Sequence, residues 1–90
     1  MKAIWKFPIS TTDLFAVTMP KGAEILSVQV QREIPCLWAI VDPDQPIEVR
    51  EFRIFGTGHP ISDEIKNKKF IGTYQLLGGN LVFHLFEELK

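Results

Sequence analysis

The sequence predicts an all-β fold: a small antiparallel barrel or roll of about six to seven strands with one short helical turn. Two observations support this fold class. Stretches in which every second residue is apolar recur along the chain, and clusters of glycine, proline, serine and aspartate separate them. With 90 residues, the chain is expected to form a single domain, residues 1–90. The predicted strands are residues 2–9, 14–19, 24–31, 36–41, 47–55, 70–76 and 81–86.

The first two strands are predicted from simple alternation. In the first, the odd-numbered residues are all apolar and are expected to point inward. Pro8 indicates an edge strand or a strand exit, because proline has no amide hydrogen to donate to a neighbour. In the second, Phe15, Val17 and Met19 are expected to share one face, and the order Pro20-Lys21-Gly22 then favours a tight turn.

The third and fourth strands are expected to form a central hairpin around which the rest of the chain is arranged. In the third strand, Leu26, Val28 and Val30 share one face and polar residues occupy the other. The fourth is apolar at every position from Cys36 to Val41, which is typical of a strand covered on both faces. The short polar connection between them favours antiparallel pairing.

The fifth strand has a break in its pattern. Glu48 and Arg50 are polar on the even-numbered face, whereas Glu51 and Arg53 are polar on the odd-numbered face. A β-bulge at Arg50 and Glu51 would absorb a slip of one residue. An edge strand exposed on both faces in its middle explains the pattern equally well, and the sequence leaves both alternatives open.

The longest stretch without a strand pattern covers residues 56–69, within which a short helical turn is expected to begin at Asp63. In the strand that follows, Phe70 and Tyr74 are expected on the same face. The glycine pair at 78–79 is expected to form the loop of the last hairpin.

Composition excludes several classes of protein. A net charge of −1 and an isoelectric point near 6.1 remove the broad attraction that non-specific nucleic-acid or anionic-membrane binding requires. The single cysteine, Cys36, excludes an internal disulfide framework and is expected to be a buried, unreactive thiol. Neither a signal sequence nor an 18-residue apolar span is evident, so we expect a cytoplasmic protein without membrane or nucleic-acid partners.

Several runs of sequence together are specific enough to indicate a family. They are MPKGAEILSVQVQ at 19–31, PCLWA at 35–39, FGTGHP at 55–60, IGT at 71–73 and VFHLF at 82–86. On these runs the chain resembles a family of short, functionally uncharacterised proteins of tailed bacteriophages and prophages. The resemblance implies a viral or proviral origin and a place in the cytoplasm of the bacterial host cell. Because the family has no assigned activity, the resemblance carries over no catalytic residue.

The sequence contains no recognisable catalytic or metal-binding constellation. Its two histidines, His59 and His84, lack the His-x-x-x-His or Cys-x-x-Cys spacing of common metal sites, and His84 is expected at a surface or an interface. Ser10 and Ser62 lack the context of a nucleophile elbow. We therefore predict no catalytic residue, no metal and no cofactor.

We predict a non-enzymatic phage or prophage accessory protein that engages a host protein, with counter-defence inhibition as one form of that activity. The acidic residues expected to meet a basic partner surface are Asp42, Asp44, Glu48 and Glu51. Because a chain this small buries only about 60 to 65 per cent of its unfolded surface, a homo-oligomer is also predicted.

The alternative is a protein that sequesters a small phosphorylated, nucleotide-like ligand. Glycine-flanked amides and a hydroxyl could receive a phosphate, and a lysine cluster follows them in the sequence. The candidate ligand-binding residues are Gly56, Thr57, Gly58, His59, Lys66, Lys68 and Lys69.

Overall fold

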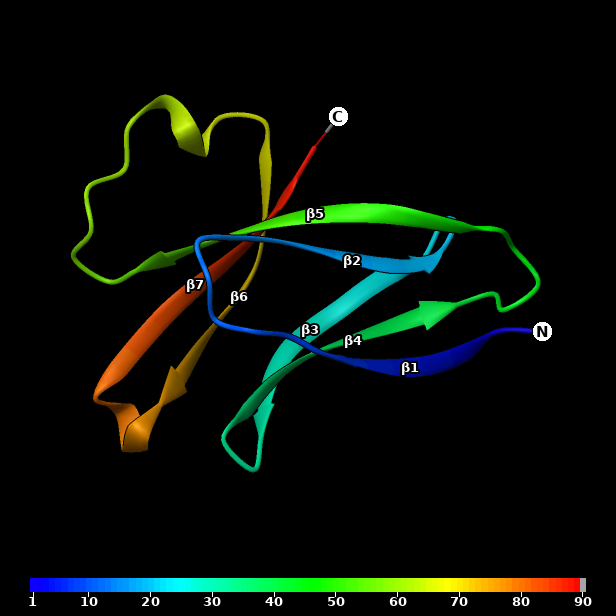
Figure 1. Ribbon diagram of the computed structural model, residues 1–90, viewed down its shortest axis with the longest axis horizontal. Coiled ribbons are helices and arrows are strands. Elements are labelled where there is room, and N and C mark those ends of the chain that lie inside the picture. The colour runs from blue at the N-terminus through cyan, green and yellow to red at the C-terminus, as the bar shows by residue number, and fades with distance from the viewer. Residues whose placement is uncertain (90) are drawn as a thin grey trace.

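The computed structural model describes residues 1–89, which form seven antiparallel strands in two sheets (Figure 1). The strands are β1 (Ala3–Pro8), β2 (Leu14–Pro20), β3 (Glu24–Gln31), β4 (Ile34–Val41), β5 (Ile47–Gly56), β6 (Lys68–Leu76) and β7 (Leu81–Glu88). Two short 3-10 turns, Asp63–Ile65 and Leu77–Gly79, complete the elements of this part of the chain. The all-β antiparallel prediction is confirmed, and the roll consists of two sheets.

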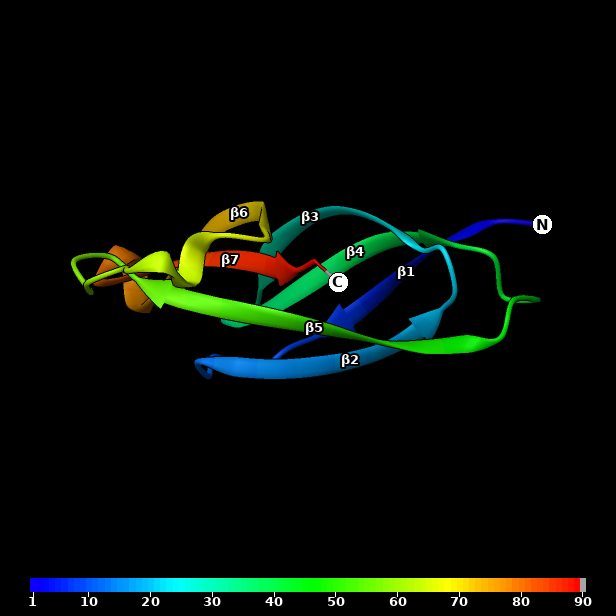
Figure 2. The same cartoon turned by 90° about the horizontal axis from the view of Figure 1, so that it is seen from above.

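The two sheets pack their inner faces together to form the core. One sheet has the strand order β1-β4-β3 and the other β2-β5-β7-β6. Figure 2 shows β2 and β5 on the opposite side of the molecule from β3 and β4. Burial of apolar side chains from both sheets stabilises the fold by roughly 25 cal/mol for each Å² removed from water. The most deeply buried large side chains are Met19, Leu37, Val41, Phe52 and Leu85.

The predicted central hairpin is present as β3 and β4, with one correction to its faces. Arg32 and Glu33 form the connecting turn and both have positive φ, as the two-residue turns of hairpins require. The β3–β4 register shifts between Ile25 and Ser27, so Leu26 sits in a bulge and stays 45% exposed. Leu26 was expected on the inner face with Val28; the bulge gives that place to Ile25 instead.

Strand β4 is covered on one face only, contrary to the expectation from its all-apolar sequence. Leu37, Ala39 and Val41 point into the core. On the other face Cys36 is buried, as predicted, whereas Trp38 and Ile40 remain partly exposed. Within residues 1–89 no second layer covers Trp38 and Ile40. A strand apolar on both faces therefore lies at the surface of the molecule.

Edge position explains the partial exposure of β1. Its odd-numbered residues face the core side as predicted, and Phe7 packs against the core. Trp5 nevertheless stays 41% exposed, because β1 is the outermost strand of its sheet.

A second bulge and a close approach shape β6. The β6–β7 register shifts between Phe70 and Gly72, which places Phe70 on the outer face, 54% exposed, while Tyr74 is buried. The prediction that Phe70 and Tyr74 share a face is therefore wrong. At Gly72, a Cβ atom would lie 2.9 Å from Cγ1 of Val28, so glycine allows β6 to approach β3 where the two sheets meet.

Candidate functional site

The fifth and seventh strands separate halfway along β5. Strand β5 pairs with β2 from Ile47 to Arg53, but with β7 only from Phe52 to Gly56. The next rung of the β5–β7 ladder would set Glu51 directly opposite Glu88 on the outer face. Like charges in that position are destabilising, which gives a physical reason for the strands to part there.

The register of β5 is continuous with both neighbours, so the predicted bulge at Arg50 and Glu51 does not occur. The alternative, an edge strand exposed in its middle, is closer to the structure: residues 47–51 have a paired neighbour on the β2 side and, within the described chain, none on the β7 side. Side chains alternate between the inner and outer faces along the whole of β5, with Arg50 on the inner face and Glu51 on the outer.

The separation leaves backbone groups of β5 without a strand partner. Ile54 donates its amide to Asp13 beside β2, whereas Thr57 donates to Val82 beside β7. Even-numbered residues of β5 therefore turn their backbone groups toward β2, and odd-numbered residues toward β7. Val49 accordingly directs its amide and its carbonyl into the gap, and Glu51 its amide, where residues 1–89 supply no ladder partner.

A groove occupies this gap. Four carboxylates against one guanidinium leave a formal charge of −3 along it, and two apolar side chains complete its walls. The lining residues are Glu48, Val49, Arg50, Glu51, Glu87, Glu88 and Leu89.

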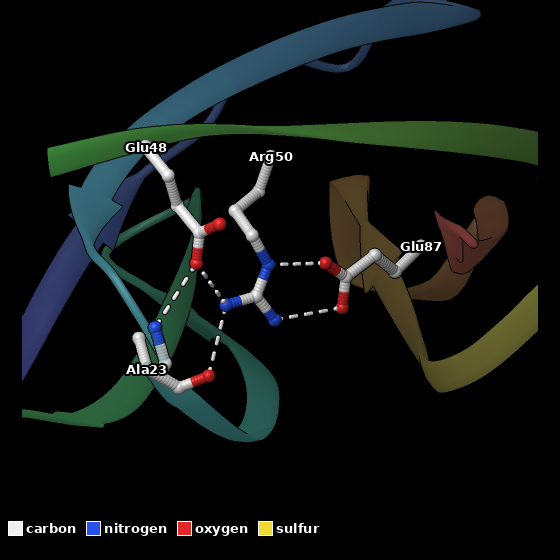
Figure 3. Close-up of polar contacts among 5 residues, drawn as sticks. Ala23, Glu48, Arg50 and Glu87 are labelled. Carbon is white, nitrogen blue, oxygen red and sulfur yellow. Dashed lines mark hydrogen bonds and ion pairs between the residues drawn. The ribbon is translucent and has the colours of Figure 1, made fainter. Parts of the chain in front are cut away.

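Arg50 bridges the groove on its inner side (Figure 3). Its Nε donates to Oε2 of Glu87, its Nη2 donates to Oε1 of the same carboxylate at 3.0 Å, and its Nη1 donates to the carbonyl of Ala23 at 2.9 Å. The side chains of Arg50 and Glu87 are only 18% and 10% exposed. The hydrogen bonds to Glu87 raise the pKa of Arg50 further above its ordinary value, against the opposing effect of burial. Each of the three guanidinium nitrogens of Arg50 therefore has an oxygen acceptor.

Glu48 also has a structural contact. Its Oε2 lies 3.7 Å from Nη1 of Arg50 and accepts a hydrogen bond of 3.0 Å from the amide of Gly22 (Figure 3). Glu51 differs, because it is exposed and no ion pair or hydrogen bond engages its carboxylate among residues 1–89. Glu88 pairs with Nζ of Lys68 at 3.0 Å. Glu51 is thus the carboxylate of the groove that is free to meet a ligand.

The structure places the four predicted interaction residues at two different sites. Glu48 and Glu51 line the groove, on opposite faces of β5. Asp42 and Asp44 lie in the loop before β5, where the Asp44 amide donates to Oδ1 of Asp42 at 3.1 Å and lowers the pKa of that carboxyl. Asp42 lines a different hollow, on the outer face of the three-stranded sheet.

The predicted ligand-binding residues lie at two separate places. Gly56 pairs with Phe83 near the start of β7, whereas Lys68 pairs with Glu88 at its end. The intervening segment makes a wide loop from the end of β5 back to the start of β6 (Figure 1).

Each of the two places is occupied by local contacts. At the first, the ring of His59 packs over Gly56, where an added Cβ would lie 2.9 Å from it, and Thr57 and Gly58 form the exposed turn between them. At the second, Nζ of Lys66 lies 3.6 Å from Oδ1 of Asp63. Lys69 is exposed on β6.

His84 lies between two hydroxyl groups on the outer face of β7. Its Nε2 is 2.6 Å from Oγ1 of Thr57, and its Nδ1 is 2.8 Å from Oγ1 of Thr73. No cluster of three or more histidine, cysteine, aspartate or glutamate side chains suited to a metal ion occurs within residues 1–89. None of the helical turns in this part of the chain has the length or apolar character needed to cross a bilayer.

Sequence reasoning missed Arg50, Glu87 and Glu88 as parts of one site. The last strand was predicted to end at Phe86, but β7 continues to Glu88. A signal was present: Arg50 shares the phase of Phe52, and Glu87 shares the phase of Leu85, so each charge follows the apolar alternation of its strand. Opposite charges among the inward-facing residues of two strands indicate a buried ion pair.

The comparisons with known proteins identify a family and no activity. The family model described as "Domain of unknown function (DUF7352)" matches residues 1–90. No curated protein and no solved structure matches the chain.

Proposed function

We propose a function for this chain from its own geometry. The chain belongs to the DUF7352 family, a domain of unknown function, so family membership assigns it no activity. The proposed function is non-enzymatic binding of a partner protein. The partner contributes an extended, basic segment that adds to the open edge of β5 in the acidic groove.

The observation that supports the proposal is the coincidence of an open strand edge with an unpaired carboxylate. The amide and carbonyl of Val49 and the amide of Glu51 are backbone groups that an added strand can satisfy. On the outer face, Glu51 and Glu88 both line the groove, so a lysine or arginine of an added strand would meet negative charge there. Backbone pairing supplies affinity, and the carboxylates select a basic segment.

The resemblance to phage proteins suggests which partner to expect. In that setting the basic segment belongs to a bacterial host protein, and occupying it would inhibit that protein, for example in host defence. The ligand-sequestering alternative would require Gly56–His59 and Lys66–Lys69 to meet in one pocket. Because their ladder partners lie at opposite ends of β7, protein binding is the better supported proposal.

Hydrogen exchange tests the open edge without any partner. The amides of Val49 and Glu51 should exchange at least about tenfold faster than those of Arg50 and Phe52, which face β2. Equal protection at all four positions would mean that the edge is closed, and the proposed mode of binding would fail.

A designed peptide tests recognition. A fluorescent ten-residue peptide that alternates lysine and threonine should bind the protein, while one that alternates glutamate and threonine should not. Backbone N-methylation at every second residue of the lysine peptide should abolish binding if its amides pair with β5. Unchanged affinity after N-methylation would contradict strand addition.

Two charge-matched variants separate the groove from general electrostatics. Glu51→Lys should weaken binding of the lysine peptide by at least about tenfold. Glu33→Lys changes the net charge equally, but in the exposed β3–β4 turn, and should alter the affinity by less than about twofold. Equal losses in both variants would contradict binding in the groove. A natural partner captured from host lysate should show the same difference between the two variants.

A further inference from the structure

The outer face of the three-stranded sheet is apolar at its centre and charged at its two edges. Along its middle strand, Ile34, Trp38 and Ile40 face outward, and Ile4 of β1 stands beside Ile40. Ile4 and Ile34 are 63% and 51% exposed. Within residues 1–89 no element packs against this face.

The sequence of β4 indicates that this face is covered in the working protein. A strand that is apolar on both faces is typical of one buried on both. The core covers only one face of β4 here. A central tryptophan surrounded by polar residues is also the usual composition of an interface centre. Trp38 has this setting: it lies between Lys6 of β1, whose Nζ is 5.9 Å from the ring centre, and Ser27 of β3.

The charges on the two edges of the face are opposite in sign. Lys2 precedes β1 and Lys6 lies within it, whereas Glu24 opens β3 on the other side of β4. Glu24 and Ile4 both pair with Ile40 and so lie at one level of the sheet. Lys6 lies two residues along the strand from that level, roughly 7 Å, which a lysine side chain can span. In the single chain its Nζ donates to Oε1 of Gln31 at 2.7 Å, and the Glu24 carboxylate of a second copy would replace this exposed contact.

We infer that a second copy of this chain covers the face, with a two-fold axis running along β4. This rotation sets each β1 over the β3 of the other copy, so Lys6 of one copy approaches Glu24 of the other twice in the dimer. Trp38 lies near the axis and meets its own counterpart. An axis across the strands would instead set lysine against lysine and glutamate against glutamate, which the charges disfavour.

A charge-swap experiment tests this arrangement by sedimentation equilibrium from about 1 to 500 μM, a range suited to a small interface. The wild-type chain should approach twice its mass of 10.3 kDa. Glu24→Lys and Lys6→Glu should each weaken dimerisation by at least about tenfold. The two changes combined should restore it to within about threefold of the wild type.

Two further variants keep the experiment decisive. Asp13→Lys makes the same charge change as Glu24→Lys at an exposed position before β2 and should leave dimerisation unchanged. Trp38→Glu, checked for folding by circular dichroism, should be monomeric throughout the range.

Three results would overturn the inference. The first is a wild-type chain that stays at 10.3 kDa over the whole concentration range. The second is a folded Trp38→Glu variant that still dimerises. The third is a double charge swap that does not restore the dimerisation lost in the single variants.

Discussion

Arg50 and Glu87 form a two-point hydrogen-bonded ion pair that joins β5 to β7 on the inner face, beside the Phe52–Glu87 rung at which their backbone pairing ends. Directly across the sheet, on the outer face, Glu51 and Glu88 have like charges and no such link. A side-chain ion pair thus links β5 to β7 at the place where their backbone pairing ends and the groove begins.

The Arg50–Glu87 pair should contribute measurably to stability, because removing one partner leaves a largely buried charge alone. Glu87→Gln and Arg50→Met should each lower the free energy of unfolding by about 1 to 3 kcal/mol. In a double-mutant cycle measured by urea denaturation, the coupling energy should exceed about 1 kcal/mol. As a control, the exposed pair Asp63–Lys66 should show coupling below about 0.5 kcal/mol. Similar values for the two pairs would mean that burial does not strengthen the inner pair.

Two leucines in adjacent strands should respond very differently to truncation. Leu37 is fully buried, so Leu37→Ala should cost about 2 to 5 kcal/mol in the free energy of unfolding. Leu26 lies in the β3 bulge, so Leu26→Ala should cost less than about 1 kcal/mol. Thermal or urea unfolding of both variants checks this. A large loss in Leu26→Ala would place that side chain in the core and contradict the bulge.

The contact between β3 and β6 should depend on the absence of a side chain at Gly72. Gly72→Ala brings a Cβ to 2.9 Å from Cγ1 of Val28 and should destabilise the protein by about 1 to 3 kcal/mol. In a Val28→Ala background the same change should cost less than about 0.5 kcal/mol, because the obstructing methyl group is gone. Urea unfolding of the four proteins measures this. Equal costs in both backgrounds would rule out steric contact as the cause.

Tyr74, the one tyrosine in the chain, should titrate late. Burial raises the pKa of its phenol above the ordinary 10.0, and the hydrogen bond with the Thr11 hydroxyl, at 2.8 Å, lowers it by a smaller amount. An absorbance titration of tyrosinate should therefore have its midpoint above 10.0 in the folded protein, and Thr11→Val should move it higher still.

The Tyr74 pKa also has a consequence for stability. Above about pH 10 the unfolded tyrosine loses its proton while the folded one keeps it, so the free energy of unfolding should fall as pH rises through this region. Tyr74→Phe should lose less stability over the same interval. A folded-state midpoint at or below 10.0 would show that burial does not govern this residue.

Much of the fold could be predicted from local patterns. The alternation in β2 correctly placed Phe15, Val17 and Met19 on one face, and the β3–β4 hairpin lies where its sequence placed it. The failures occurred where one residue changes the phase. Bulges at Leu26 and Ile71 cannot be recognised from alternation alone, because the extra residue is itself apolar in both strands.

The candidate site was less predictable than the fold. Glu48 and Glu51 were chosen for their charge and do line the groove, but Asp42 and Asp44 are elsewhere. Charge on its own could not separate these residues, because the groove depends on which residues of β7 lie opposite β5.

The sequence by itself determined that this chain folds as antiparallel strands with a shared apolar core, since alternation and turn residues act locally and need no knowledge of the partner strand. Only the tertiary structure decided how the inner charges pair, where β5 and β7 part, and which face of β4 stays open. Each of these depends on the register between strands distant in sequence, and cross-strand neighbours are chosen by the packing of the whole core.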